Sequence, residues 1–521
     1  MERSLVCLIV FTVIGFVLFL LGVILGWAVF PPLVRQQIID NVVLDREGTE
    51  QWDRFVELPQ PLLFKVYIFN VTNPDEVINN QALPVVEEIG PYIYRQYRRK
   101  PHVEFMNDNE EIQFLQESEF VYDHRLSAPL SQDDPLFVIS LHINSVLMEV
   151  ESTMEIFLQP INDALHYIFG DNPSMIMRTT PRSLLFEGIE FCWPGRHPLA
   201  DVVCNIVKEQ ITDAMIVLPD GTLSFAMFRH KNMTNNGLFR VHSGRVEPRD
   251  VQQIITWENK IALDVWPNNA DGTTSVCNEI RGSDGAAFRP LQETGESAFI
   301  FNTDICQTVR LEYDGQGEYE GIPAFKYTAS PSFIAQIGPE YNNSCFCINH
   351  IPGGIVQENG CLYPGAMDLS TCQGAPLLLT KPHLLGADHY QSFVHGLSPD
   401  PEKHDIIVLV EPNTGSPLLA ASRVQFNQFL RPVQHVEITQ NLGHSIVPIL
   451  WIEEGIELND ELVDFIRSSL VDVLVILDAV HWTLFAVGLA LFIAMLTWLI
   501  VVLVKRRQHN QVGNFDVTTA K

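Results

Sequence analysis

Positive charge is scarce in this sequence, and so are the motifs of common enzymes. Among 521 residues, 33 Lys and Arg stand against 63 Asp and Glu, a formal net charge of −30. Because a phosphate backbone is bound by clustered cations, this shortage argues against a nucleic-acid partner. The templates His-Glu-x-x-His, Gly-x-Ser-x-Gly, Gly-x-x-x-x-Gly-Lys and Cys-x-x-Cys are absent. We therefore expect neither an enzyme nor a resident metal or cofactor.

Candidate catalytic and ligand residues are scattered. His383, His395 and His404 stand apart in the chain, and a lone histidine is usually structural. The paired acids Asp133-Asp134 and Glu453-Glu454 are typical of solvated faces. We identify no catalytic residues in the sequence.

Internal repeats, Gly/Ser linkers and low-complexity tracts are missing too. An aromatic content of 10% argues against disorder. No shift in composition marks a domain boundary, so we expect one large domain, although the length allows two or three. The mean hydropathy of +0.10 and hydrophobic fraction of 46% do not suit a strongly acidic soluble protein. The apolar residues are therefore expected to be concentrated in a few places.

Two long apolar runs account for much of this excess. Leu5–Phe30 and Trp482–Val504 contain no charged residue, and a helix needs about 20 apolar residues to cross a bilayer. A cleaved signal peptide has a shorter core of about 7–15 residues and a small-residue cleavage site. The first run is longer and ends in Trp27-Ala-Val-Phe-Pro-Pro32. We therefore predict an uncleaved transmembrane helix at each end.

The charges beside the second run predict the topology. Lys505-Arg506-Arg507 follows it directly, and clustered cations mark the cytoplasmic side. Residues 1–4 and the tail 505–521 are then cytoplasmic, 5–30 and 482–504 span the plasma membrane, and 31–481 is extracellular. Because the tail carries a net +3, the extracellular part carries −33.

Glycosylation sequons and cysteines agree with an oxidising environment for residues 31–481. The three sequons are Asn70-Val-Thr72, Asn232-Met-Thr234 and Asn342-Asn-Ser344. An even number of extracellular cysteines suits complete pairing, although spacing alone does not choose among the pairings. The eight are Cys192, Cys204, Cys277, Cys306, Cys345, Cys347, Cys361 and Cys372.

Two cysteine features admit alternatives. Cys345-Phe-Cys347 suggests a metal site, but zinc sites of this kind space their cysteines more widely and need further ligands nearby, so disulfides are favoured. The ninth cysteine, Cys7, lies at the cytoplasmic end of the first span. It is either a buried small hydrophobe or an S-palmitoylation site.

The extracellular part is predicted to be mostly β-structure with a helical insert. Stretches such as Leu63–Phe69 and Ile406–Val410 are typical of strands, separated by turn residues. At about 135–169 apolar residues instead recur at helical spacing. The one local basic cluster outside the membrane is Tyr94–Lys100. It is interpreted as a solvated strand edge or, alternatively, as a docking patch for an anionic partner.

Motifs along nearly the whole chain resemble the class B scavenger receptor family of two-pass lipid receptors. They are Phe64–Val77, Glu88-Ile-Gly-Pro-Tyr92, Asn302-Thr-Asp-Ile-Cys306, Gly321-Ile-Pro323, Cys345-Phe-Cys347, Lys381-Pro-His383, Gly396-Leu-Ser-Pro399 and Ile446–Trp451. Within the family, insect sensory neuron membrane proteins are similar in carrying an extra cysteine pair after a Leu-Phe-x-Gly motif. Here Leu185-Phe-Glu-Gly188 precedes Cys192 and Cys204.

The resemblance implies a mixed α+β fold. It consists of a large antiparallel β-barrel with a lipid-sized tunnel and a membrane-distal helical bundle, held by the two terminal transmembrane helices. The implied disulfides are Cys277–Cys345, Cys306–Cys372 and Cys347–Cys361. Cys192 and Cys204 are then left to pair with each other.

Two departures from the family bear on the ligand. Lipid-binding members carry lysines just after the helical bundle, where this chain has Gly170-Asp-Asn-Pro-Ser174, and another near Pro331-Ser-Phe333, which also lacks a cation. A buried carboxylate without a cationic partner is costly. The resemblance therefore implies neutral lipophiles, such as esters, alcohols or aldehydes, rather than fatty acids or anionic lipoproteins.

By this resemblance the chain is a non-enzymatic cell-surface receptor or lipid carrier in olfaction. Its partners would be small hydrophobic odorants or pheromones, the membrane and odorant receptor subunits. The alternative is a scavenger receptor that takes up lipids or lipoproteins. A lysosomal trafficking receptor is less favoured, because the tail 505–521 has no Leu pair of the kind those members carry.

Overall fold

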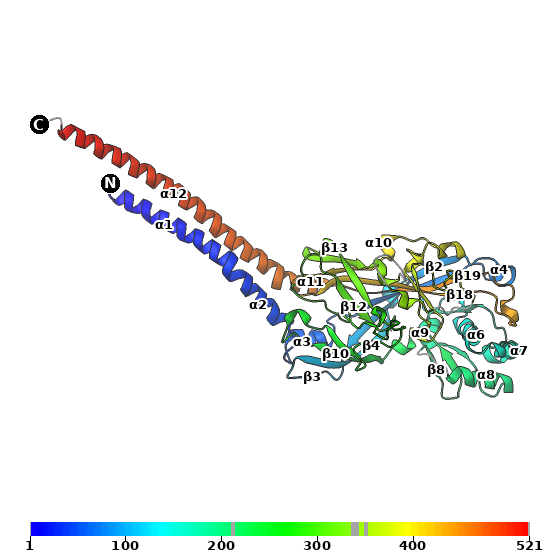
Figure 1. The fold of residues 1–521 in the computed structure, drawn as a ribbon. Coiled ribbons are helices and arrows are strands. Elements are labelled where there is room, and N and C mark those ends of the chain that lie inside the picture. Colours follow the sequence, from blue (N-terminus) through cyan, green and yellow to red (C-terminus); the bar gives the residue numbers. More distant parts are fainter. Residues whose placement is uncertain (1, 210–213, 335–342, 349–352, 519–521) are drawn as a thin grey trace. The chain divides into compact units, whose positions relative to one another are not determined.

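The computed structural model describes residues 2–209, 214–334, 343–348 and 353–518, without the side chains of 2–4 and 509–518 (Figure 1). The chain divides into two compact units. The helix-pair unit comprises Met1–Asn41, Glu320–Ile322 and Leu458–Lys521, and the sheet unit comprises Val42–Tyr319 and Pro323–Glu457.

Two long helices build the helix-pair unit, and both extend beyond the apolar runs that predict them. Helix α1 (Glu2–Ile24) continues through a π-turn, η1 (Leu25–Val29), into α2 (Phe30–Val42). Helix α11 (Asp460–Ile466) continues through a second π-turn, η12 (Arg467–Val471), into α12 (Asp472–Thr518). Pro31 and Pro32 do not end the first helix, because they lie in the first turn of α2, directly after the π-turn, where a missing N–H is tolerated. By length and hydropathy, Leu5–Val42 and Asp460–Gln508 are candidate membrane spans.

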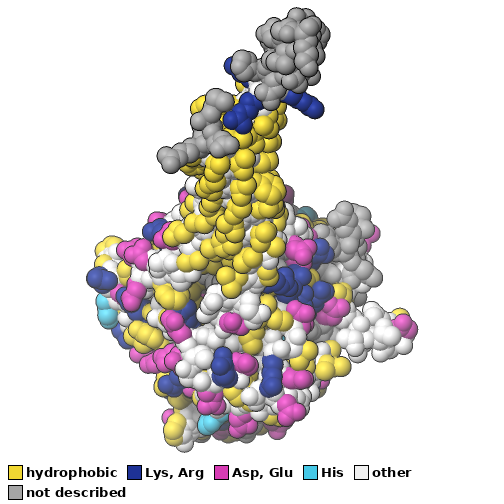
Figure 2. All heavy atoms as spheres, turned by 90° about the vertical axis from the view of Figure 1, so that its left-hand side faces the viewer, with side chains coloured by type: hydrophobic (Ala, Val, Ile, Leu, Met, Phe, Trp, Pro, Cys, Tyr) yellow, Lys and Arg dark blue, Asp and Glu magenta, His cyan; other side chains and the backbone are white. Residues whose placement is uncertain are grey.

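Hydrophobic side chains cover the paired helices along most of their length, and Lys and Arg side chains gather toward the C-terminal tip (Figure 2). Phe16 lies 5.2 Å from Phe492, and Phe19 lies 5.2 Å from Phe485, measured between ring centroids. A Cβ added at Gly22 would lie 2.5 Å from the backbone nitrogen of Phe485. Small residues thus let the two backbones approach closely, as is common between helices in membranes.

Replacing Gly22 with leucine is expected to push α1 and α12 apart. The obstructing atoms belong to the backbone of Phe485 and cannot rotate away, so the axes should separate toward the ~10 Å typical of large interface residues. Distances between spin labels on the two helices, in the full chain in nanodiscs, measure the change. Val13→Leu, at a position that is 55% exposed, is the control and should leave the distances unchanged. Equal distances in Gly22→Leu and the parent chain would contradict close glycine packing.

One large antiparallel sheet organises the sheet unit. Its strands run in the order β11-β10-β4-β2-β1-β19-β18-β17-β14-β13-β12, with β3, β15 and β16 off this path. The strands are β1 (Leu62–Val71), β2 (Val86–Arg99), β3 (Glu104–Met106), β4 (Glu111–Tyr122), β10 (Thr234–His242), β11 (Ile254–Trp257), β12 (Ala298–Asn302), β13 (Gln307–Tyr319), β14 (Ile322–Ala329), β15 (Ala366–Asp368), β16 (Leu378–Thr380), β17 (Ile407–Val410), β18 (Pro417–Leu430) and β19 (Ser445–Glu457).

Alternation along the strands decides which side chains face the interior. In β4 every second residue from Ile112 to Phe120 is buried, and the residues between them are half-buried or exposed, as expected for a strand with one buried face. The first eight residues of β19 are all buried instead, because both faces of that strand are covered.

The sheet is open, so the closed barrel implied by the resemblance is not observed in the described part of the chain. Its end strands β11 and β12 do not pair with each other. A loop lies between them instead. The N–H of Ile254 donates to Gly282 O at 2.8 Å, and the N–H of Phe301 donates to Ser283 O at 2.9 Å. Irregular backbone thus occupies the position where a barrel would have its last strand pairing.

Helices at one end of the sheet unit lie largely in the predicted insert of about 135–169. Helix α6 (Leu141–Met154), the 3₁₀ turn η2 (Glu155–Phe157) and α7 (Leu158–Phe169) fall within it, but its first residues form strand β5 (Leu136–Ile139). That strand pairs with β6 (Ile176–Thr179). A further helix, α8 (Pro198–Glu209), was not predicted.

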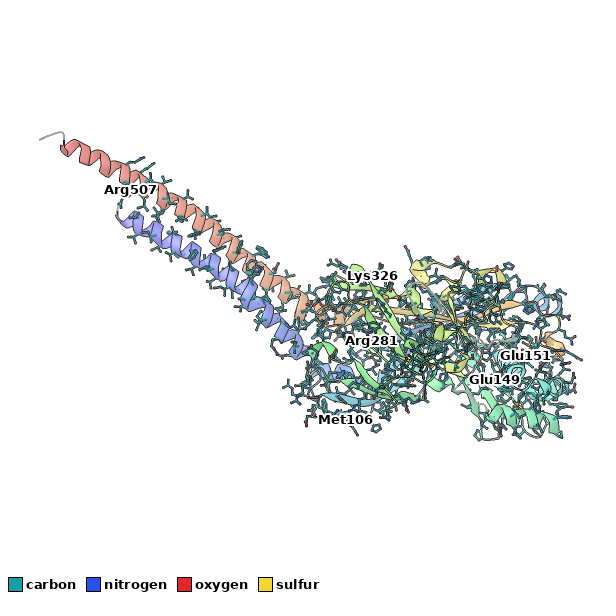
Figure 3. The ribbon with its side chains drawn as sticks, in the orientation of Figure 1. Met106, Glu149, Glu151, Arg281, Lys326 and Arg507 are labelled. Carbon is teal, nitrogen blue, oxygen red and sulfur yellow. A yellow bond between two sulfur atoms is a disulfide. The ribbon has the colours of Figure 1, made fainter. Side chains whose placement is uncertain are left out.

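Buried polar contacts fix α6 to the sheet. Asn144 Nδ2 donates to Gln428 Oε1 at 2.9 Å, and Gln428 Nε2 donates to Ser145 Oγ at 2.8 Å. Arg431 Nη1 lies 3.2 Å from Glu151 Oε1, and Figure 3 shows Glu149 and Glu151 on this helix. These contacts hold the insert over β18.

Short elements complete the sheet unit. They are α3 (Glu50–Val56), α4 (Pro74–Asn80), α5 (His124–Ser127), η3 (Ser183–Glu187), β7 (Ile189–Phe191), β8 (Met215–Val217), β9 (Leu223–Phe225), η4 (Arg229–Lys231), η5 (Pro248–Asp250), η6 (Val276–Asn278), η7 (Pro331–Phe333), η8 (Ser344–Phe346), α9 (Ser370–Gln373), η9 (Pro382–Leu384), η10 (Tyr390–Phe393), α10 (Pro401–His404) and η11 (Glu437–Thr439).

Candidate ligand cavity

A cavity of about 180 Å³ lies inside the sheet unit. Strands β2, β4, β10, β12, β13, β17, β18 and β19 contribute to its lining, together with α6 and the segment after β9. The cavity is therefore enclosed mainly by the large sheet, while the lipid tunnel that the resemblance implies stays a prediction.

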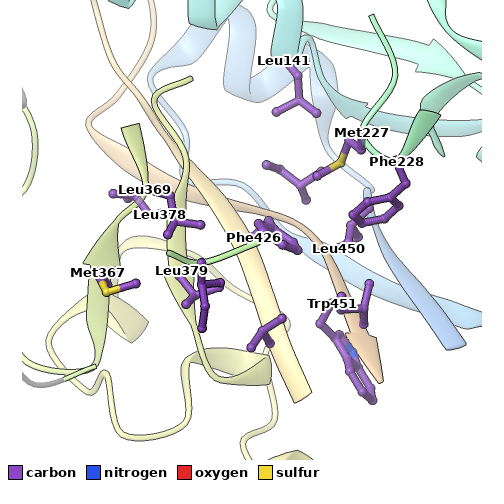
Figure 4. Close-up of a cluster of buried hydrophobic side chains, with 14 of the residues drawn as sticks. Leu141, Met227, Phe228, Met367, Leu369, Leu378, Leu379, Phe426, Leu450 and Trp451 are labelled. Carbon is purple, nitrogen blue, oxygen red and sulfur yellow. The ribbon is translucent and has the colours of Figure 1, made fainter. Parts of the chain in front are cut away.

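One wall of the cavity is apolar. Figure 4 shows Met227 and Phe228 close to Leu141 from α6 and Phe426 from β18, and all four line the cavity and are buried. A smaller apolar cavity of about 50 Å³ lies among α6, α7 and α8. The two cavities share Ser145, Phe225 and Ala375 in their linings, so apolar surface continues from the helices into the sheet.

The lining also carries charges that were not predicted from the sequence. Arg98 Nη2 lies 2.7 Å from Glu454 Oε1, and Lys231 forms an ion pair with Asp304. Asp284 Oδ2 lies 3.8 Å from Nζ of Lys100. Two cations, Arg98 and Lys231, thus line the cavity although none was expected near Pro331–Phe333, of which Phe333 does line it.

These charges stabilise one another rather than standing free. Burial by itself would raise the pKa of Asp304, but Lys231 outweighs that effect and holds the pKa below its ordinary value. Burial likewise would lower the pKa of Lys231, yet Asp304 and Glu454 raise it. Each cation in the lining is thus paired with a carboxylate of the protein. A carboxylate ligand would have to displace one of these protein carboxylates.

Residues 94–99 of the basic cluster lie in β2, in the middle of the sheet between β1 and β4, and Lys100 follows the strand directly. The interpretation as a strand edge is therefore wrong. Alternation turns Arg98 and Lys100 inward, while Arg95 pairs with Asp123 at 2.7 Å and Arg99 with Glu117 at 3.1 Å. With an acidic partner for each cation, the cluster does not present free positive charge to an anionic protein.

Glu88, His383 and His404 come together although the sequence separates them, with one ligand atom of each within 4.8 Å of the others. Their hydrogen bonds argue against metal binding. Nδ1 of His383 accepts from the Ser398 N–H, and Nδ1 of His404 accepts from the Asp400 N–H, both at 3.0 Å. In the neutral ring Nε2 then carries the proton and is no metal ligand.

Glu88 is the acceptor at the centre of this network. Its Oε2 lies 2.6 Å from Nε2 of His383 and accepts a hydrogen bond from Nε1 of Trp451, also at 2.6 Å. Burial alone would raise the pKa of Glu88, but these two hydrogen bonds outweigh it and lower the pKa. The cluster is therefore a hydrogen-bonded support between β2 and β19.

Folding stability is expected to fall as the pH drops below 6.5. Burial lowers the pKa of His142 and of His404 to about 4, so between pH 6.5 and 4 the unfolded chain binds protons that the folded chain does not. Asp284 and Asp304 have lowered pKa values. Their stabilisation is complete above the unfolded value of 3.8 and is lost as the pH falls through the lower folded values.

Melting temperatures from tryptophan fluorescence across this pH range test the prediction. His142→Gln should flatten the slope between pH 6.5 and 4, and His435→Gln, at an exposed position, is the matched control. A melting temperature that is constant from pH 7 to 4 would contradict the assignment.

Four disulfides join the eight cysteines of the sheet unit. They are Cys192–Cys204, Cys277–Cys345, Cys306–Cys372 and Cys347–Cys361, the same pairs that the resemblance implies. The first links α8 to the segment after β7. Cys7 in α1 is a free, exposed cysteine within a candidate membrane span, and both interpretations of it, a small hydrophobe and a palmitoylation site, stay predictions.

Two of the three predicted glycosylation sites lie in the described residues. Asn70 is the last but one residue of β1, and its Oδ1 accepts from the Phe137 N–H at 2.9 Å. Asn232 Oδ1 accepts from the Phe120 N–H at 2.9 Å. A glycan is attached through Nδ2, so these bonds are compatible with the modification, which stays a prediction. Asn342 lies outside the described residues.

Known proteins resemble this chain over most of its length. A sequence profile described as CD36 family matches residues 13–499. Sensory neuron membrane protein 2 of Anopheles gambiae is 41% identical, over 94% of this chain and 92% of that protein. The proteins of the same name from Aedes aegypti and Drosophila melanogaster are 42% and 37% identical, over 89% and 94% of this chain and 93% and 97% of their own lengths.

Proposed function

The chain belongs to the CD36 family, and on that premise we propose that it binds lipophilic odorants or pheromones in the cavity and delivers them to the sensory membrane or to odorant receptors. Membership supports a membrane receptor or lipid-binding role. The proposed role in delivering odorants or pheromones is supported by relatives that are named sensory neuron membrane proteins.

The observation that carries the proposal is the cavity of about 180 Å³ with an apolar wall and internally paired charges. Transfer of a lipophilic molecule out of water is favourable when it enters an apolar cavity or a bilayer. At about 25 cal/mol per Å², burial of ~300 Å² contributes roughly 7 kcal/mol before the costs of association. Because the charges are paired, we propose neutral ligands over fatty acids.

The proposed topology is two-pass, with both termini cytoplasmic and the sheet unit extracellular. The two apolar helices fit such a protein, and the Lys505–Arg507 cluster supports the orientation. Epitope tags at each terminus should react with antibody only after the plasma membrane of expressing cells is permeabilised. Labelling of a terminal tag on intact cells would contradict this topology.

Sensory neurons that lack the protein test the proposed role directly. Their odorant-evoked currents should be smaller and slower, and expression of the parent chain should restore them. Ala420→Trp, which narrows the cavity, should not restore them, whereas Leu419→Trp on the other face of β18 should. Unchanged currents in the absence of the protein would contradict the delivery role and leave lipid uptake as the alternative.

A further inference from the structure

We propose that the cavity selects lipophilic ligands that carry a hydroxyl group, and that Asp284, Gln96 and Gln116 receive this hydroxyl. The proposal rests on the proposed function, because it concerns the ligand of the same cavity. It narrows the neutral lipophiles to long-chain alcohols over aldehydes and esters.

The polar wall is built by the inward faces of β2 and β4. Arg98 stands opposite Ser118, and Gln96 stands opposite Phe120 in the antiparallel register. Gln116 is the next inward residue of β4. Gln96, Arg98, Gln116 and Asp284 all line the cavity, and the first three come from these two paired strands.

Asp284 supplies a carboxylate of which only one oxygen accepts a hydrogen bond. Its Oδ1 accepts from the Ala286 N–H at 3.0 Å. Its Oδ2 is buried and has no hydrogen-bond partner among the described residues. Lys100 does not fill this place, because its Nζ is 3.8 Å away and donates instead to Phe55 O at 3.1 Å. An ionised carboxylate oxygen only accepts hydrogen bonds, so it favours a ligand that donates.

Gln96 and Gln116 add two deeply buried amides. They are 1% and 4% exposed, and Oε1 of each has no hydrogen-bond partner within the described ranges. Gln96 Nε2 makes only a long 3.4 Å contact with Ser118 Oγ. An amide can be turned about its terminal torsion and then presents N–H instead of oxygen. A hydroxyl both donates and accepts, so it satisfies either orientation.

Arg98 adds a hydrogen-bond donor for the ligand hydroxyl. Its Nη2 pairs with Glu454 at 2.7 Å, while its Nε is buried and has no hydrogen-bond partner in the part of the chain that is described. The wall therefore offers acceptors at Asp284 and the amides and a donor at Arg98.

Alcohols, aldehydes, esters and carboxylates differ in the hydrogen bonds that they can form with this wall. An aldehyde or ester oxygen accepts but does not donate, so it leaves Asp284 Oδ2 unsatisfied. A carboxylate finds the cations Arg98 and Lys231 already paired with acids and would have to displace one of these acids. An alcohol donates to Asp284 or an amide oxygen and accepts from Arg98. Sites built to bond a hydroxyl reject analogues that lack it, because their own buried groups are then left unpaired.

Competition binding to the full chain in nanodiscs tests the proposal. Tritium-labelled dodecan-1-ol is displaced by unlabelled dodecan-1-ol, dodecanal, dodecyl acetate or dodecanoic acid, and empty nanodiscs correct for partitioning into lipid. We expect the alcohol to bind about tenfold more tightly than the other three. Equal affinities of alcohol and aldehyde would overturn the inference while leaving the ligand cavity intact. Absence of saturable binding by any probe would overturn the proposed function as well.

Single-residue variants test whether the polar wall formed by β2 and β4 causes the preference for the alcohol. Gln116→Met and Gln96→Met remove an amide at nearly constant volume without unpairing a charge, and each should reduce the advantage of the alcohol to about threefold or less. Gln113→Met makes the same change on the other face of β4 and should preserve the full advantage. An alcohol preference that both inward variants retain would overturn the role given to Gln96 and Gln116.

Discussion

Replacing Lys231 with methionine is expected to lower the free energy of unfolding by about 1–3 kcal/mol, because it leaves the partly buried carboxylate of Asp304 without its partner. The Lys231 side chain is 7% exposed, and its ammonium pairs with Asp304 in the cavity wall. Methionine keeps much of the volume of lysine, so the loss reports the charge rather than the packing. Chemical unfolding of the full chain, followed by tryptophan fluorescence, measures it.

Two further variants distinguish loss of the Lys231–Asp304 ion pair from a general loss of folding stability. Arg249→Met breaks a partly exposed pair with Glu296 and should cost only about 0–1 kcal/mol. The double variant Lys231→Met with Asp304→Asn removes both charges and should recover part of the stability. Equal stability of Lys231→Met and Arg249→Met would show that the lysine does not compensate a partly buried acid.

Ala420→Trp is expected to weaken dodecan-1-ol binding at least about 30-fold, because the indole occupies space that the ligand needs. Ala420 lines the cavity from β18, so the larger side chain enters existing space, and overpacking should cost no more than about 1–3 kcal/mol of stability. The competition assay in nanodiscs gives the affinity, and the melting temperature shows that the variant folds.

Leu419→Trp is the matched control for this variant. Leu419 is adjacent in β18, and its side chain points to the other face of the strand, as the alternating lining residues Ala420, Ser422 and Val424 indicate. This variant should bind the alcohol like the parent chain. A folded Ala420→Trp chain with full affinity would place the ligand elsewhere.

Features that depend on local sequence were predicted most fully. The two membrane helices follow from uncharged runs, because every residue of a span faces lipid or its partner helix. Their true lengths were not predictable, since the π-turn that carries the first helix past Pro31 and Pro32 has no simple sequence signal. The insert was found by its helical periodicity, but Leu136–Ile139 pairs with a distant strand and takes its conformation from that partner.

Features that depend on long-range pairing were predicted least. The residues of a strand do not show whether one or both of its edges are paired, and this is why β2, which lies between β1 and β4, was interpreted as an edge. Arg98 was not predicted as a cavity cation because the expectation rested on two family positions rather than on the alternation of Gln96, Arg98 and Lys100. Alternating polar residues in a strand with a buried face were the available signal. The disulfide pairs came from the resemblance, since spacing alone leaves them open.

The central claim is that the ligand lies inside the sheet unit, and photo-labelling tests it most directly. The full chain in nanodiscs is irradiated with a dodecanol that carries a diazirine near its chain end, and labelled residues are identified by mass spectrometry. We expect labels in peptides that contain the lining residues Met227, Leu377 or Phe426, and excess dodecan-1-ol should suppress them. Labels confined to α1 and α12, or labels that excess alcohol does not suppress, would contradict a ligand site in this cavity.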